Sequence, residues 1–262
     1  MGISEDEQRR LRDLLDAFGA LKQEFVATRY LAWLAGDYDS PIREHASAVS
    51  AKVKFLDSLS YVRWGARTGL AVGAFAGAMN LLDKVAGFVH LYLETGRVRD
   101  VYFGRLWHRG HPAKPAPMDT ALADELRAGN RGLLALCDLS CDLDPERQSP
   151  LAEFIEMRHS ATHRFLVAHD MLLEERTPTS EWVQRVEHRE LLEATRQLLG
   201  TGRAALLYLA RTVDIRERRT GFGSDTLNEA AQPAPDTPAS DQRFERRLRL
   251  PLHRAATEHP DY

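Results

Sequence analysis

Cysteine is scarce in this chain of 262 residues, which has only Cys137 and Cys141. Their spacing is that of neighbours on a helix, and two cysteines cannot make the framework of a disulfide-stabilised fold. The acidic start Ser4-Glu5-Asp6-Glu7 also lacks the positive charge of a secretory signal peptide. Free thiols and no such signal are typical of a reducing compartment, so we predict a cytoplasmic protein.

A long apolar run free of charged residues is also absent. The most apolar stretch, 69–93, is interrupted by Asp83, Lys84 and His90, which would be costly in a membrane. It therefore predicts a buried helix and no membrane partner. Acidic and basic residues nearly balance at 38 and 35, for a net charge of −3, so any surface for nucleic acid must be a local patch.

Several catalytic signatures are missing from the sequence. It has no Gly-x-Ser-x-Gly elbow, no phosphate loop ending in Gly-Lys-Ser/Thr, and no Gly-x-Gly-x-x-Gly after a strand. Cys137 has no obvious partner base for a cysteine nucleophile. These absences disfavour serine or cysteine hydrolases, P-loop nucleotidases and dinucleotide enzymes.

Helical periodicity is what the sequence does contain, over most of residues 1–219. Ser4 and Glu7 have the spacing of a capping box, and Gly36 is a stop signal. No convincing run of strands appears, so we predict an all-α bundle of about six to eight helices. The expected elements are 4–34, 41–64, 67–95, 119–143 with a break near Gly129, 151–173 and 178–218.

Residues 220–262 have a different character and predict a disordered tail. The stretch 232–240 is rich in proline and small polar residues, as linkers are. Four arginines then fall between residues 243 and 249. They fit either a solvated tail or a contact with a polyanion.

Three glycines, Gly69, Gly73 and Gly77, repeat at every fourth position of the apolar helix. Glycine weakens a helix, so a row of three indicates the close approach of another helix. That neighbour could belong to the same chain or to a second subunit.

The segment 156–164 carries the clearest chemical signal, because Arg158, His159 and His163 lie together in it. A histidine moves protons near neutral pH, and a guanidinium holds phosphate oxygens. His159 and His163 are one turn apart, whereas Arg158 and His163 are about 140° apart around a regular helix. Arg158 and His163 could still meet, because the arginine side chain is long. A local distortion of the helix or a dimer partner could also bring them together.

Three interpretations of this segment stay open. In the structural one, Arg158 pairs with Glu153, Glu156 or another carboxylate. In the second, His159 and His163 bind a metal ion, with Glu156 one turn earlier. In the third, Arg158 and His163 perform acid–base chemistry on a phosphodiester.

Asp83 and Lys84 form a second polar pair, inside the apolar helix. Burying them without partners would be expensive, so we expect partners for both. An internal salt bridge or exposure to solvent satisfies this expectation. Alternatively, Lys84 faces the same cleft as Arg158 and holds phosphate.

Arg158-x4-His163, late in a helical chain, resembles the Arg-x(4–6)-His signature of the HEPN superfamily, the higher eukaryotes and prokaryotes nucleotide-binding domains. A polar residue such as His159 commonly follows the arginine in that superfamily. The segments 75–88, 101–103 and 106–107 are similar to a bacterial HEPN subgroup sometimes joined to tetratricopeptide repeats. The resemblance covers roughly residues 65–175.

This resemblance implies a helical bundle that usually dimerises. Catalytic HEPN members are metal-independent endoribonucleases of toxin–antitoxin, phage-defence or RNA-processing systems, and others only bind nucleotides or proteins. By position, Arg158 and His163 would be the active pair, with His159 in support. Toxins of this kind that are silenced by tyrosine modification carry a tyrosine where this chain has Phe165, so that control is not expected.

The resulting expectation is an endoribonuclease that uses the 2'-hydroxyl of RNA as nucleophile and needs no cofactor or metal. Arg158 and His163 are catalytic, and His159, Glu156, Asp83 and Lys84 give support. The expected partners are RNA, a second copy of the chain and an antitoxin or regulatory protein. The alternative is a non-catalytic helical module that binds nucleotides or proteins.

Overall fold

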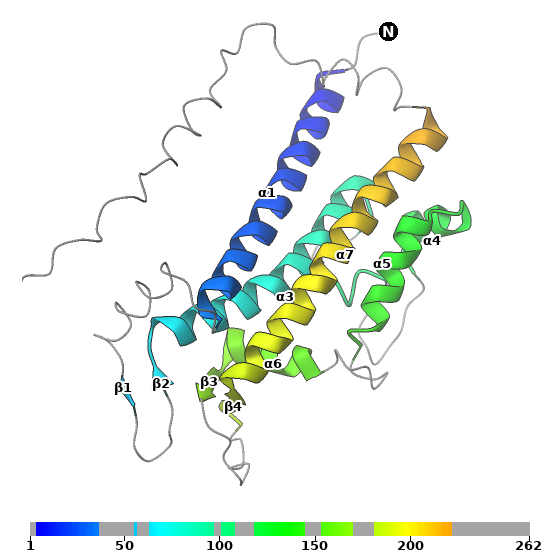
Figure 1. Cartoon of the computed structure of the whole chain (residues 1–262). Coiled ribbons are helices and arrows are strands. Elements are labelled where there is room, and N and C mark those ends of the chain that lie inside the picture. The colour runs from blue at the N-terminus through cyan, green and yellow to red at the C-terminus, as the bar shows by residue number, and fades with distance from the viewer. Residues whose placement is uncertain are drawn as a thin grey trace, which may run out of the picture. The chain divides into compact units, whose positions relative to one another are not determined.

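The computed structural model describes residues 4–36, 55–56, 63–96, 101–107, 118–144, 153–169 and 181–221. The chain divides into two units, residues 1–216 and 217–262. Six helices lie in the described part, which confirms the all-α class (Figure 1). They are α1 (Glu5–Ala35), α3 (Ala66–Leu93), α4 (Thr120–Arg127), α5 (Arg131–Cys141), α6 (Glu153–His163) and α7 (His188–Thr220).

Helix α1 begins and ends where the sequence predicts. The Ser4 backbone N–H donates to Glu7 Oε2 at 2.9 Å, and the Glu7 N–H donates to Ser4 Oγ at 3.3 Å, which completes the capping box. At the other end, the N–H of Gly36 bonds to the carbonyl of Trp33.

Helix α3 is the centre of the core. Thirteen of its residues are buried, among them Phe75, Leu81 and Val85. It packs along α1, as Figure 1 shows, and Leu81 contacts α7 near Gly202. Its length and composition would suit a membrane span, but more than half of its most apolar window is buried inside the protein. The prediction of a buried helix for residues 69–93 is therefore confirmed.

One of the three repeating glycines lies at the contact between α1 and α3. A Cβ atom at Gly77 would lie 2.7 Å from Oγ1 of Thr28, which is itself buried. Apart from the adjoining residues and backbone of α3 itself, no described residue lies within 4 Å of a Cβ built at Gly69 or Gly73. Close packing within the chain therefore explains Gly77.

Alanine at Gly77 is expected to destabilise the protein by about 1–2 kcal/mol, because overpacking against Thr28 outweighs the gain in helix propensity. Alanine at Gly69, in the same helix, should instead stabilise by up to about 1 kcal/mol. Urea unfolding of both variants measures the difference. If both substitutions stabilised the protein equally, the Thr28 side chain would have to move away from the new methyl group without a loss of free energy.

The predicted break near Gly129 separates α4 from α5. Gly129 has a φ of +80°, a conformation that favours glycine, and Asn130 then caps α5 by accepting the N–H of Leu133. A second close approach lies just beyond. A Cβ atom at Gly132 would lie 2.4 Å from the backbone nitrogen of Thr212, so α5 crosses α7 at this glycine.

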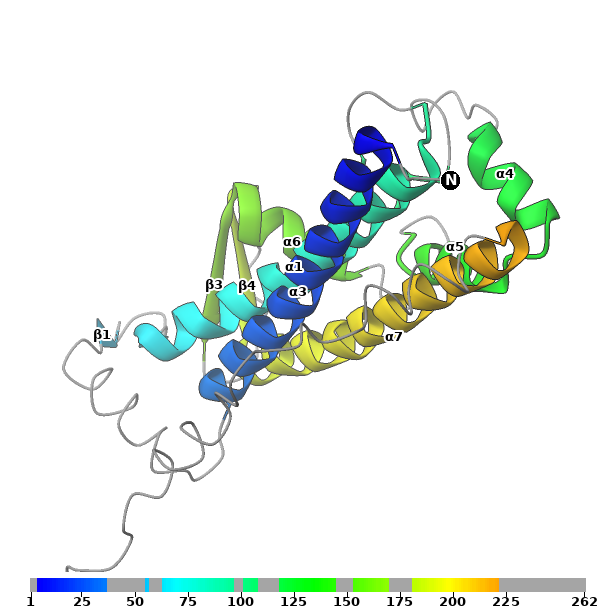
Figure 2. The same cartoon turned by 90° about the horizontal axis from the view of Figure 1, so that it is seen from above.

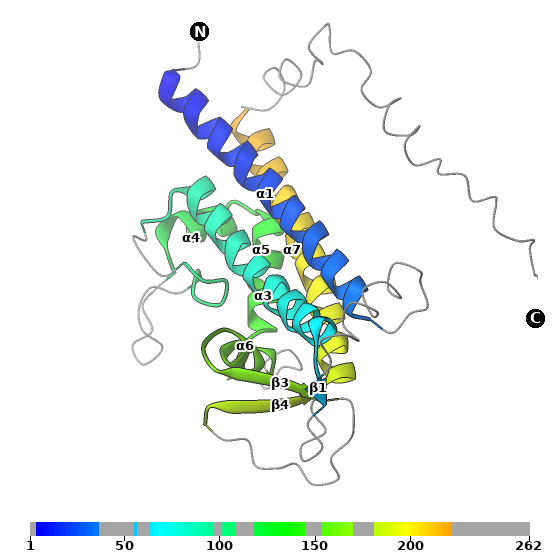
Figure 3. The ribbon, with the colours of Figure 1, turned by 90° about the vertical axis from the view of Figure 1, so that its left-hand side faces the viewer.

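The predicted helix 151–173 is wrong in its second half. Helix α6 ends at His163, and residues Phe165–His169 form strand β3. Strand β4 (Val183–Glu187) pairs with β3 in parallel and occupies part of the predicted helix 178–218, so that α7 starts only at His188 (Figure 3). Phe165 and Val167 suit a strand, and their partner lies 18 residues away in the register Phe165–Val183.

The predicted element 41–64 lies mostly outside the described residues. Its described parts are β1 (Phe55–Leu56) and β2 (Arg63–Trp64), which form a short antiparallel pair. The glycine- and proline-rich loop near residue 112 and the tail beyond residue 221 also fall outside the described part.

Candidate functional site

Helix α6 presents the signature residues along its exposed and half-exposed sides. Its buried side consists of Phe154, Met157 and Ser160. The ring of Phe154 meets that of Phe75 on α3 edge to face, with centroids 6.4 Å apart. This packing fixes the helix against the core next to α3, as Figure 2 also shows.

Arg158 reaches across to α3 and pairs with Asp83. Its Nη2 donates to Oδ2 of Asp83, while the backbone N–H of Phe103 donates to Oδ1 of the same carboxylate at 3.0 Å. The side chain of Arg158 keeps 26% of its surface exposed, against 18% for Asp83. The carboxylate therefore orients a guanidinium that solvent still reaches.

Tyr102 adds an aromatic face to this cluster. The guanidinium carbon of Arg158 lies 5.9 Å from the centre of the Tyr102 ring, and that of Arg105 lies 6.0 Å from it. Both are at the distance of cation–π contacts. The segment 101–107 is anchored in the core by Phe103, Leu106 and Trp107, which are buried.

The environment of Asp83 has two opposing effects on its pKa. Burial raises the pKa above its ordinary value of 3.8, and the hydrogen bond from Phe103 and the charge of Arg158 lower it. Burial prevails, so the folded protein binds the proton more readily than the unfolded chain does. Ionisation of Asp83 in the folded state is therefore costly even beside Arg158.

This sign gives a pH-dependent prediction for Asp83→Asn, which keeps an acceptor for Phe103. As the pH rises from about 4 through the pKa of folded Asp83, the wild type should lose stability relative to Asp83→Asn. Urea unfolding at several pH values measures the difference. The control is Asp124→Asn, which makes the same change at an exposed carboxylate. If the stability of the wild type instead rises relative to that of Asp83→Asn with increasing pH, the charge of Arg158 has a larger effect on the pKa of Asp83 than burial has.

His159 and His163 lie together on the solvent side of α6. Both are exposed, and their ring centroids are 5.1 Å apart at an interplanar angle of 62°. Within the described residues, no third His, Cys, Asp or Glu joins them in a group that could hold a metal ion. Glu156 is exposed one turn earlier.

Lys84 does not join the Arg158 cluster. It pairs with Glu24 of α1, and its side chain is 59% exposed. Neighbouring residues of a helix differ by about 100° in direction, so the side chains of Asp83 and Lys84 point towards different elements. The structure thus gives each member of this polar pair a partner, as expected.

The sequence pattern of the LA2681-like HEPN family matches residues 6–216. The chain belongs to this HEPN family. The match includes all six described helices, apart from the first residue of α1 and the last residues of α7, and thus both Arg158 and His163. Comparison with curated proteins and with solved structures gave no match. Family membership supports a nuclease-type or nucleotide-binding module.

Two features of this HEPN site were not assigned from the sequence. The family resemblance includes Tyr102 and Phe103 but gives them no role, yet they contact the Arg158–Asp83 pair. The sequence does not indicate the partner of Arg158, because Asp83 is 75 residues away in the chain. Spacing along one helix indicates Arg158 and His163, but it cannot indicate what packs against them.

Proposed function

We propose that this HEPN protein is a metal-independent endoribonuclease. The observation that supports it most is that α6 carries an oriented, solvent-accessible guanidinium and two exposed imidazoles within two turns. Neither Arg158 nor His163 is enclosed among aliphatic side chains. Solvent reaches both: His163 is exposed, and Arg158 keeps 26% of its side-chain surface exposed while it is paired with Asp83.

RNA supplies its own nucleophile, the ribose 2'-hydroxyl. A base must take its proton, an acid must protonate the leaving 5'-oxygen, and charge on the phosphoryl oxygens must be stabilised. His163 suits the proton transfer and Arg158 suits the charge. The products are a 2',3'-cyclic phosphate and a 5'-hydroxyl, so the balance requires neither metal nor cofactor.

One histidine is a poor candidate for both acid and base in the same step. A homodimer that unites two copies of Arg158 and His163 in one cleft supplies the second group. His159 supports His163 from within the same chain, since their rings are neighbours. Asp83 and Glu156 are positioning residues in this scheme. Lys84, which pairs with Glu24 of α1, takes no part in it.

The test is to incubate the purified protein with RNA in excess chelator. Cleavage that persists in chelator supports the proposal. Cleavage that disappears and returns with a divalent ion would instead favour the metal interpretation of His159 and His163. Intact RNA under all conditions would favour the second candidate function.

That second candidate is a non-catalytic module that binds nucleotides or proteins. The Arg158–Asp83 pair favours it, because a carboxylate already engages the guanidinium. For the nuclease, the proposed setting is cytoplasmic, in a toxin or phage-defence system. An antitoxin or regulatory protein would hold the activity in check.

A further inference from the structure

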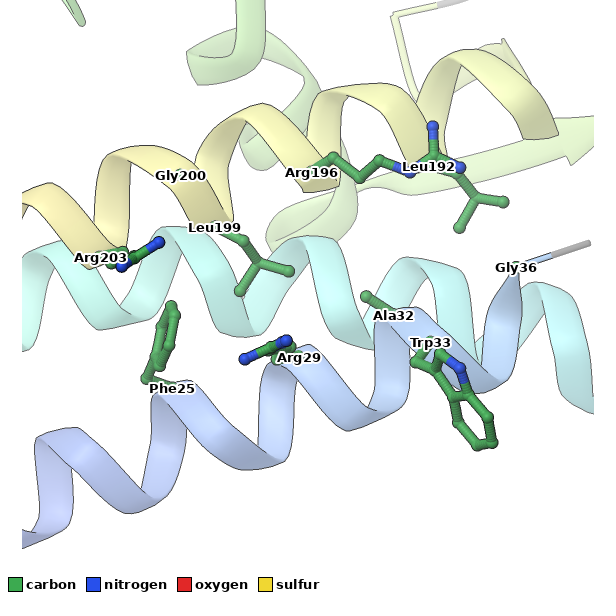
Figure 4. Close-up of a pocket in the computed structure, with 10 residues that line it drawn as sticks. All are labelled: Phe25, Arg29, Ala32, Trp33, Gly36, Leu192, Arg196, Leu199, Gly200 and Arg203. Atoms are coloured by element: carbon green, nitrogen blue, oxygen red, sulfur yellow. The ribbon is translucent and has the colours of Figure 1, made fainter. Parts of the chain in front are cut away.

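A groove of about 530 Å³ lies between α1 and the first half of α7 (Figure 4). Its volume is within the usual range of ligand sites. Helix α1 contributes Phe25, Arg29 and Trp33 to its lining, and α7 contributes Arg196, Leu199 and Arg203. None of the residues proposed for cleavage lines it.

The charged side chains that line this groove are all arginines. Arg196 pairs at 2.6 Å with Glu193, a residue that does not line the groove. Arg29 and Arg203 are exposed, and neither forms an ion pair with any residue in the described part of the chain. Guanidinium groups around one space repel each other, and a bound anion would turn this repulsion into attraction.

The groove is elongated, which favours a strand over a single phosphate group. Along α1 and its C-cap, the lining extends from Phe25 to Gly36, or about 16 Å at the usual rise per residue. On α7, Arg196 and Arg203 are about 10 Å apart along the axis by the same measure. Successive phosphates of one strand could meet successive arginines.

Apolar groups in the groove suit the bases of such a strand. In Figure 4, Phe25 points from α1 towards α7, and Leu199 points from α7 towards α1. At the rim, the Trp33 ring stacks on that of Tyr30 with centroids 5.8 Å apart, and both residues are exposed. An exposed aromatic face beside arginines is the usual equipment for binding single strands.

The geometry points to this groove as a binding site for single-stranded RNA, distinct from Arg158 and His163. The choice of RNA as the strand rests on the proposed function. The groove holds the substrate through phosphates and stacked bases, without sequence readout.

The test measures fluorescence anisotropy of a short single-stranded 2'-O-methyl RNA, which cannot be cleaved, over a range of salt. The variant is Arg29→Ala/Arg203→Ala. The matched control is Arg9→Ala/Arg211→Ala, which removes one exposed arginine from each of the same two helices outside the groove. The groove variant should bind about tenfold or more weakly, with a salt slope smaller by about one to two. The control should bind like the wild type.

Equal weakening in both double variants, or no weakening in either, would overturn the proposal. Two other results would also overturn it. One is arginine-dependent binding of a nucleoside triphosphate in the groove while RNA affinity stays unchanged. The other is a groove variant whose only change is its oligomeric state. Because the RNA is uncleavable, failure here is separate from failure of the nuclease. If the groove variant binds RNA like the wild type and the protein still cleaves RNA, only the groove proposal is refuted.

Discussion

Replacing His163 with alanine is expected to reduce RNA cleavage about 10²–10⁴-fold, because the step loses a positioned proton carrier. The side chain is exposed at the end of α6, so its removal should leave the stability nearly unchanged. Single-turnover cleavage rates and urea unfolding measure the two quantities. Glu153→Ala, another exposed position of the same helix, is the matched control and should keep its activity.

Arg158→Ala should cost about 10²–10³-fold in rate, since charge at the phosphate loses its stabilising donors. It also leaves the half-buried Asp83 without its cation, so a loss of stability accompanies the loss of rate. Arg158→Lys separates the loss of rate from the loss of stability, because lysine restores a positive charge near Asp83 but not the fork of hydrogen-bond donors. We expect that variant to recover stability more than activity. Full activity in Arg158→Ala or His163→Ala would remove these residues from the chemistry.

Trp107→Ala is expected to have the largest effect on stability, a loss of about 3–5 kcal/mol. The Trp107 side chain is only 1% exposed, and its ring meets that of Phe103 edge to face. The cavity would loosen the segment that carries Tyr102 and the N–H donor to Asp83. Cleavage should therefore fall along with stability, although Trp107 touches neither Arg158 nor RNA in this account.

Trp182→Ala is the control for this prediction, because its side chain is 61% exposed. Its unfolding free energy should stay within about 0.5 kcal/mol of the wild type. Chemical denaturation followed by circular dichroism compares the two without relying on tryptophan fluorescence. Similar stabilities for both variants would mean that the segment 101–107 is not anchored as described.

The sequence predicts those parts of the fold that local signals determine. The Ser4–Glu7 capping box, the stop at Gly36 and the turn at Gly129 each act within a few residues, and each appears as expected. Strand β3 shows the limit of this approach. Its residues continue the helical pattern of α6, but pairing with β4 gives them a partner that no local window contains.

The candidate site divides in the same way. Arg158 and His163 are indicated by their spacing on one helix, and the family match includes both. The sequence predicts partners for Asp83 and Lys84. That these are Arg158 and Glu24 depends on how α3 packs against α6 and α1. Arg29 of the groove lies more than 160 residues before Arg196 and Arg203 in the sequence, so no motif connects it to them.

The end groups of the RNA fragments distinguish cleavage by the 2'-hydroxyl from metal-dependent hydrolysis. Wild-type protein in excess chelator should leave 2',3'-cyclic phosphate and 5'-hydroxyl ends, and His163→Ala should leave neither. These ends require attack by the 2'-hydroxyl without a metal-bound water. Fragments with 5'-phosphate ends that form only with a divalent ion, or undiminished cleavage by His163→Ala, would contradict the account.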